Sequence, residues 1–62
     1  MKTSEAIRKL KNAGCWFVEH GGEHDCWHSP VTGKRFRVPR HPSQELAKGT
    51  KGNIEKLSGV KL

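Results

Sequence analysis

The chain has 62 residues, with 12 lysines and arginines against 6 acidic residues, and its formal net charge at pH 7 is +6. A single domain of this length, expected over residues 1–62, buries only about 60% of its unfolded surface, which excludes an enclosed cofactor cavity. No apolar run is long enough for a transmembrane helix or a secretory signal sequence, so we expect a cytoplasmic protein. The basic charge favours a polyanionic partner, of which nucleic acid is the commonest.

The segment TSEAIRKLKNAG, residues 3–14, predicts a helix. Thr3 or Ser4 is a suitable N-cap, and Gly14 is a suitable stop because glycine takes up the left-handed backbone conformation without strain. Apolar residues recur at helical spacing and form one stripe for the core: Ala6, Ile7, Leu10 and Ala13.

Three short strands are predicted next, over residues 15–19, 24–28 and 34–39. The Gly-Gly pair at 21–22 separates the first two, and we expect it to supply the positive φ angles that a tight hairpin needs. The third strand alternates cleanly, which places Phe36 and Val38 on one face and Arg35 and Arg37 on the other.

The last segment begins as a loop anchored by Leu46, and a second helix follows it. Thr50 is the expected N-cap, Ile54 and Leu57 form a short apolar stripe, and Gly59 ends the helix. The order is therefore α-β-β-β-α, an α+β fold. We expect a three-stranded antiparallel sheet with both helices on one face, and an open face that carries the arginines of the third strand.

The stretch HGGEHDCWHSP, residues 20–30, concentrates titratable side chains, and zinc is the first chemistry to consider. The candidate ligands are Cys15, His20, His24, Cys26, His28 and His41. Structural zinc sites usually pair their ligands as C-x₂₋₄-C with H-x₃₋₅-H, and this chain has no CxxC pair. We therefore expect no metal and no cofactor.

The register of the first hairpin decides which residues face the helices. If residue 19 pairs with residue 24, Cys26 lies opposite Phe17. The two cysteines are then diagonal neighbours about 7–8 Å apart, too far for a relaxed disulfide, and we expect free thiols. Cys15, Phe17 and Cys26 would face the helices, so Trp16 and Trp27 would fall on the open face, where either can stack an unpaired base or contact a protein partner.

Metal-free RNA cleavage is a further chemistry that so small a chain can support. Histidine is the side chain whose ordinary pKa suits proton transfer near pH 7. If the 2′-hydroxyl of RNA attacks the adjacent phosphate, the protein supplies no nucleophile, and one histidine on a basic sheet is enough. Spacing alone does not single out one of the four histidines.

The whole chain resembles the HicA family of bacterial toxin–antitoxin systems. The matching stretches are NAGCWFV at the end of the first helix, GGEH in the hairpin, HSPVTGKRFRVPRHP, and ELAKGTKGNIEKLSG at the end. The resemblance implies a fold like that of double-stranded-RNA-binding domains. It also implies the toxin of a type II system, a ribonuclease that cleaves mRNA and is neutralised by a HicB-like antitoxin.

One catalytic position carries over from the family. Its catalytic histidine follows the hairpin glycine by two residues, which is His24 here. Three positions depart from the family pattern. Glu23 replaces the usual serine, Asp25 replaces the histidine often found next, and Cys15 replaces the usual tryptophan, with Trp16 beside it.

The leading hypothesis is a metal-independent endoribonuclease with His24 as general base or acid. The residues expected to bind RNA are Lys34, Arg35, Arg37, Trp27 and Lys51. The amides of residues 50–52 at the expected start of the second helix either hold a phosphate or simply belong to its cap. The alternatives are a non-catalytic double-stranded-RNA-binding module and a zinc-dependent nucleic-acid module. Cleavage in the presence of a chelator, together with metal analysis, discriminates the three.

Overall fold

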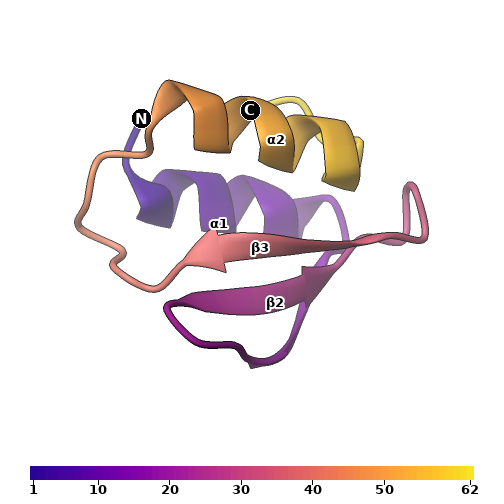
Figure 1. Ribbon diagram of the computed structural model, residues 1–62. Helices are drawn as coiled ribbons and strands as arrows, with labels where there is room; N and C mark the ends of the chain where they lie inside the picture. The colour runs from indigo at the N-terminus through magenta and orange to yellow at the C-terminus, as the bar shows by residue number, and fades with distance from the viewer.

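The computed structural model describes residues 1–62 and confirms the α-β-β-β-α order. The elements, shown in Figure 1, are α1 (Thr3–Asn12), β1 (Trp16–His20), β2 (His24–His28), β3 (Arg35–Pro39) and α2 (Lys48–Ser58). The three strands form one antiparallel sheet in the order β1-β2-β3. No helix has the length and apolar character that crossing a membrane requires.

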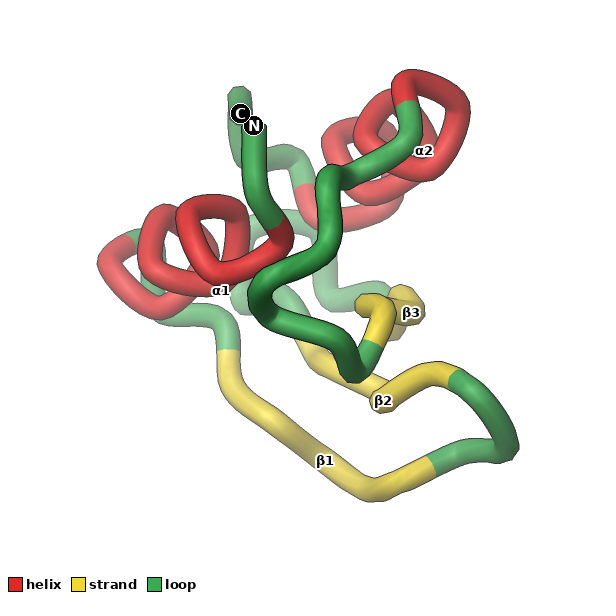
Figure 2. Tube along the Cα trace, turned by 90° about the vertical axis from the view of Figure 1, so that its left-hand side faces the viewer, coloured by secondary structure: helices red, strands yellow, loops and turns green.

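The molecule has two layers, as predicted. Figure 2 shows both helices on the same side of the sheet, with the other side of the sheet free of helices. Both chain ends lie on the helical side of the molecule (Figures 1 and 2). The terminal ammonium of Met1 contacts Glu45 at 2.6 Å, and Lys9 donates to the carbonyl of Leu62 at 3.1 Å. The N-terminal residues and the loop before α2 therefore form one side of the molecule.

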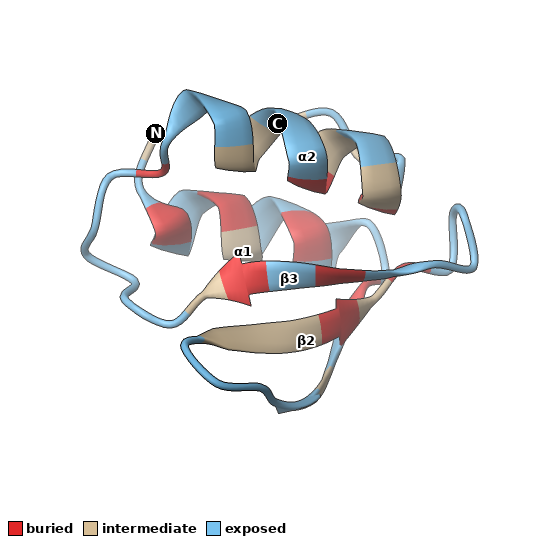
Figure 3. Cartoon of the chain, viewed as in Figure 1, coloured by how far each residue is buried: buried red, intermediate tan, exposed pale blue.

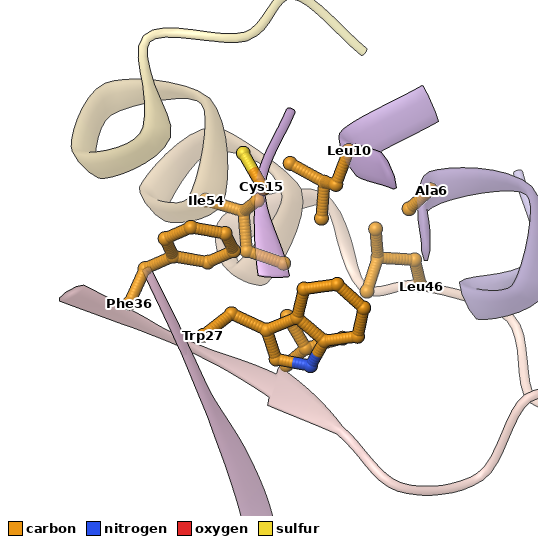
Figure 4. Packing of buried hydrophobic residues seen from close by; sticks show 8 residues of the cluster. Ala6, Leu10, Cys15, Trp27, Phe36, Leu46 and Ile54 are labelled. Atoms are coloured by element: carbon orange, nitrogen blue, oxygen red, sulfur yellow. The ribbon is translucent and has the colours of Figure 1, made fainter. Parts of the chain in front are cut away.

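The core lies between the helices and the sheet (Figure 3). It is built from eight buried hydrophobic residues: Ala6, Leu10, Cys15, Trp27, Phe36, Val38, Leu46 and Ile54. Figure 4 shows the Trp27 indole and the Phe36 ring among aliphatic side chains from both helices and from the loop before α2. Leu46 is 6% exposed, which confirms it as the anchor of that loop.

The expected register of the first hairpin is wrong, by two residues next to the turn and by one residue beyond a bulge in β1. Glu19 pairs with Cys26 and Phe17 with Trp27, so Val18 between them has no partner on β2. Such a bulge places two residues of one strand opposite one residue of its neighbour. The shift turns Cys26 to the open face and Trp27 to the helices, the reverse of the prediction.

Burial of the Trp27 ring is the physical reason for this register. An indole buries about 150–250 Å², which at about 25 cal/mol per Å² is worth about 4–6 kcal/mol. The indole N–H of Trp27 has no hydrogen-bond partner in the core, at a cost of about 1–3 kcal/mol. The balance favours burying the ring, and Cys26, a much smaller side chain, takes the half-buried position on the other face.

Both predicted helix starts are wrong. Thr3 is inside α1 with Lys2 at the N-cap, and the Thr3 hydroxyl donates instead to the carbonyl of Gln44 at 3.0 Å. Likewise α2 begins at Lys48, so Thr50 lies within its first turn. The predicted stops are confirmed, since Gly14 has φ 95° and Gly59 has φ 72°.

The two connections of the sheet are built differently. The Gly-Gly pair at 21–22 does not have the positive φ angles that we expected, whereas Gly33 in the second turn does. The second turn is also tied to the end of α2. The buried Ser29 hydroxyl donates to the carbonyl of Ser58, and the Thr32 hydroxyl donates to that of Leu57 at 2.6 Å. The β1–β2 hairpin projects away from the helices (Figure 2).

Candidate functional site

The face of the sheet without helices carries a row of polar and basic side chains. His24, Cys26 and His28 alternate along β2, so they share one face. Opposite Cys26 and His28 lie Arg37 and Arg35 of β3, both exposed. The predicted orientation of the two arginines is therefore confirmed. On the open face Arg35 therefore lies directly opposite His28, and Arg37 lies opposite Cys26, two residues along β2 from His24.

His24 lies where three surface hollows meet, at the end of β2 next to the hairpin. One hollow of about 460 Å³ is lined by His24, Arg37, Gly49, Thr50 and Asn53. It brings the start of β2 and the edge strand β3 together with the first two turns of α2. His24 is half-buried, so its backbone is held by the sheet while its side chain borders solvent.

The start of α2 borders this hollow through Gly49 and Thr50, so of the predicted amides of residues 50–52 only that of Thr50 lies there without a partner inside the helix. The amide of Lys51 already donates to the carbonyl of Ala47 at 2.8 Å. The amides without a partner inside the helix are those of Lys48, Gly49 and Thr50. The positive end of the helix dipole lies at the same place, and it favours an anion.

Two predicted RNA-binding side chains lie apart from His24. Lys51 is half-buried in α2 and lines none of the hollows. Lys34 is exposed just before β3, at the other end of the ladder, beside the pair formed by His28 and Arg35. The prediction that Trp27 stacks a base on the open face is corrected, because this ring is 5% exposed and belongs to the core. Trp16 does lie on the open face and is 49% exposed.

Trp16 and His28 form an aromatic pair at the end of the open face away from the hairpin. The two residues are paired across β1 and β2, and their ring centroids are 4.7 Å apart with the ring planes tilted by 36°. Arg35 lies on the other side of His28. This row of an indole, an imidazole and a guanidinium offers flat surfaces on which an unpaired base can stack.

A second polar cluster lies on the opposite face of the hairpin and was missed at the level of sequence. Asp25 accepts a hydrogen bond from the Nε of Arg40 at 3.0 Å and lies 2.7 Å from Nδ1 of His20. Arg40 also donates to the carbonyl of Gly21. The hydrogen bond with His20, supported by the contact with Arg40, holds the pKa of the Asp25 carboxyl below its ordinary value. Nothing in the spacing of these residues indicated that they meet.

The titratable side chains do not assemble into a metal site. No three histidine, cysteine, aspartate or glutamate side chains lie close enough together to hold an ion. Cys15 is buried in the core and Cys26 is half-buried on the open face, and both are free thiols. His41 lines another of the hollows that His24 borders, together with Arg40 and Gln44.

Fold and site together define a small basic α+β domain with a histidine at the end of an open sheet face. The family model described as the HicA toxin of bacterial toxin–antitoxin systems matches residues 3–60, and the chain belongs to this family. Membership implies a cognate antitoxin as partner. No curated protein sequence and no solved structure matches the chain significantly.

Proposed function

We propose that this protein is a metal-independent endoribonuclease that cleaves mRNA in the cytoplasm, with His24 as its catalytic residue. One observation carries the proposal. The half-buried His24 borders a hollow that is also lined by Arg37 and by Gly49 and Thr50, two residues of α2 whose amides have no partner inside the helix. A phosphate in that hollow meets a proton-transfer group, a fixed positive charge and backbone donors at once.

The chemistry needs no atom from the protein in a covalent bond. His24 in its neutral form accepts the proton of the 2′-hydroxyl, and the 2′-oxygen attacks the adjacent phosphorus. The bond from phosphorus to the 5′-oxygen breaks, and the protonated His24 returns the proton to that oxygen, directly or through a water molecule, which restores the neutral imidazole. The products are a 2′,3′-cyclic phosphate and a 5′-hydroxyl. Arg37 offsets the charge that develops on the phosphoryl oxygens.

The rest of the open face supplies the path for the RNA. Arg35 and Arg37 contact phosphates, while Trp16 beside His28 stacks an unpaired base. His28 lies four residue steps from His24 along β2, which is about 13–14 Å at 3.3–3.4 Å per residue. Lys34 adds a phosphate contact beyond this row. Lys51 contributes long-range attraction from α2, since it lies outside the hollows.

Replacement of His24 tests the proposal directly. His24→Ala should lower the cleavage rate by ~10²–10⁴-fold, the usual contribution of a proton-transfer group. The free energy of unfolding should change by less than about 0.5 kcal/mol, because His24 does not belong to the buried core. The assay uses purified protein, single-stranded RNA and a chelator. His28→Ala on the same face of the same strand is the matched control. With saturating RNA it should cleave within a few-fold of wild type, because its imidazole belongs to the stacking row and transfers no proton.

The same assay separates the proposal from a non-catalytic double-stranded-RNA-binding module. The α-β-β-β-α order favours that alternative as a second candidate. If the wild-type protein binds duplex RNA but cleaves no RNA with or without added metal ions, the alternative replaces the proposal. Cleavage that stops when the chelator is added would contradict metal independence alone.

We further expect a HicB-like antitoxin to cover the open face. The net charge of +6 and the exposed arginines suit an acidic partner surface. RNA and antitoxin should therefore compete, and RNA should raise the apparent Kd for the antitoxin in a binding titration with the His24→Ala variant. A stable complex that holds both ligands would contradict this occlusion.

A further inference from the structure

We propose that Arg40 and Asp25 are positioning residues that fix the β1–β2 hairpin and thereby hold His24 in place for catalysis. The proposal rests on the proposed function of His24. It assigns a role to a polar cluster that lies on the other face of the hairpin from Arg35 and Arg37. Its members are His20, Gly21, Asp25 and Arg40.

The contacts form a short path from β3 to the catalytic residue. Arg40 directly follows β3 and donates both to Asp25 and to the carbonyl of Gly21. The amide of Gly21 in turn donates to the carbonyl of His24 at 2.9 Å. The backbone of His24 is thus connected through one residue to a planar guanidinium with two fixed partners. Because the guanidinium donates in a rigid fork, it fixes direction as well as distance.

The hairpin needs such a connection because little else holds it. Residues 21–23 are exposed, and the Gly-Gly pair has the greatest backbone freedom of any pair in the chain. No side chain other than Arg40 hydrogen-bonds the backbone of this loop. The first core residue of β2 is Trp27, which lies four residues after the last loop residue, Glu23.

The geometry assigns Asp25 to positioning rather than to substrate contact. Asp25 pairs with Val38, which is fully buried, so it faces the helical side of the sheet while His24 faces the open side. Its carboxylate is one-fifth exposed, and one oxygen serves both His20 and Arg40. Two cationic or donor groups on one carboxylate keep it ionised and keep Arg40 aimed at Gly21.

Arg40 has a rival role that the experiment must separate. It also lines the hollow shared by His24 and His41, so its guanidinium could contact phosphate directly. Direct contact predicts weaker RNA binding and a smaller salt dependence when Arg40 is removed. Positioning predicts normal binding and slow cleavage.

The kinetic test uses Arg40→Ala, Asp25→Ala and the double variant. Under single-turnover conditions with saturating RNA, each should cleave at least tenfold more slowly than wild type. RNA affinity, measured for each substitution in the His24→Ala background, should stay within twofold. The double variant should be no slower than the slower single variant, because both substitutions break the same path. Weakened RNA binding with an unchanged saturated rate would overturn the proposal.

A second measurement does not depend on activity. Amide hydrogen exchange of Gly21 should become at least tenfold faster in Arg40→Ala, while exchange of Phe36 in β3 stays as in wild type. His20→Ala is the matched control, because it removes one partner of Asp25 but leaves Arg40 in contact with Gly21. Asp25→Asn, a milder change, replaces Arg40→Ala if that variant does not fold. If the wild-type protein cleaves no RNA, the proposed function fails while this test still stands. Unchanged Gly21 exchange would refute the positioning role.

Discussion

The two faces of the sheet use neighbouring residues of the same strands for different purposes. On the face toward the helices, Phe36 and Val38 are at most 2% exposed and fill the core. On the open face, Arg35 and Arg37 alternate with them and point into solvent. Because adjacent residues point to opposite sides of a strand, one face can carry stability while the other carries charge for a ligand. Substitutions in β3 should therefore separate folding from RNA binding, residue by residue.

The largest expected effect is on stability, and it comes from a substitution on the face of the sheet that the helices cover. Phe36→Ala should lower the free energy of unfolding by about 3–5 kcal/mol, from lost burial and the cavity that remains. A domain of 62 residues has about 3–9 kcal/mol in total, so this substitution should remove at least about a third of the free energy of unfolding. Arg37→Ala, one residue further along β3, should cost less than about 0.5 kcal/mol. Urea unfolding followed by circular dichroism measures both, and similar costs for the two would mean that the faces are not separate.

The fold was predictable where one strand or helix contains its own pattern. The alternation of β3 gave the orientation of four residues, and the stripe of α1 gave Ala6 and Leu10 in the core. Orientation in β2 was not predictable, because residues 24–28 alternate weakly and the bulge at Val18 lies in the other strand. The predicted N-cap of α1 was wrong for a related reason. The Thr3 hydroxyl bonds Gln44, and local residue type says nothing about a partner that far along the chain.

The candidate site was predictable only in part. The resemblance pointed to His24, and β3 pointed to its arginines, but nothing in the sequence placed Gly49 and Asn53 beside them. Whether these residues of α2 lie beside His24 and Arg37 depends on how α2 packs against the sheet. Arg40 and Asp25 are fifteen residues apart and join only because the strands are paired in this register.

If RNA binds the open face, removing the arginines of that face should weaken the salt dependence of RNA binding. In the His24→Ala background, the slope of log K against log salt for single-stranded RNA should be roughly −3 to −4. Replacing both Arg35 and Arg37 by alanine should reduce the magnitude of this slope by about 1.4, which is about 0.7 for each lost phosphate contact. The matched control removes two exposed cations from α1, Arg8→Ala with Lys11→Ala. It changes the net charge equally but should leave the slope almost unchanged. Equal reductions in both variants would mean that RNA responds to total charge and not to this face.

The smallest expected effect concerns Asp25 on the covered side of the hairpin. The hydrogen bond with His20 and the contact with Arg40 lower the pKa of its carboxyl below the ordinary 3.8. A carboxyl whose folded pKa is lowered stabilises the fold above its unfolded pKa, and this contribution is lost as the pH falls through the folded pKa. The wild-type protein should therefore exceed Asp25→Asn in urea midpoint at pH 5, and the difference should shrink toward pH 2. Glu45 beside the terminal ammonium is shifted in the same direction, but it is present in both proteins and cancels in the comparison. A difference that stays constant from pH 5 to pH 2 would show that Asp25 contributes by shape and not by charge.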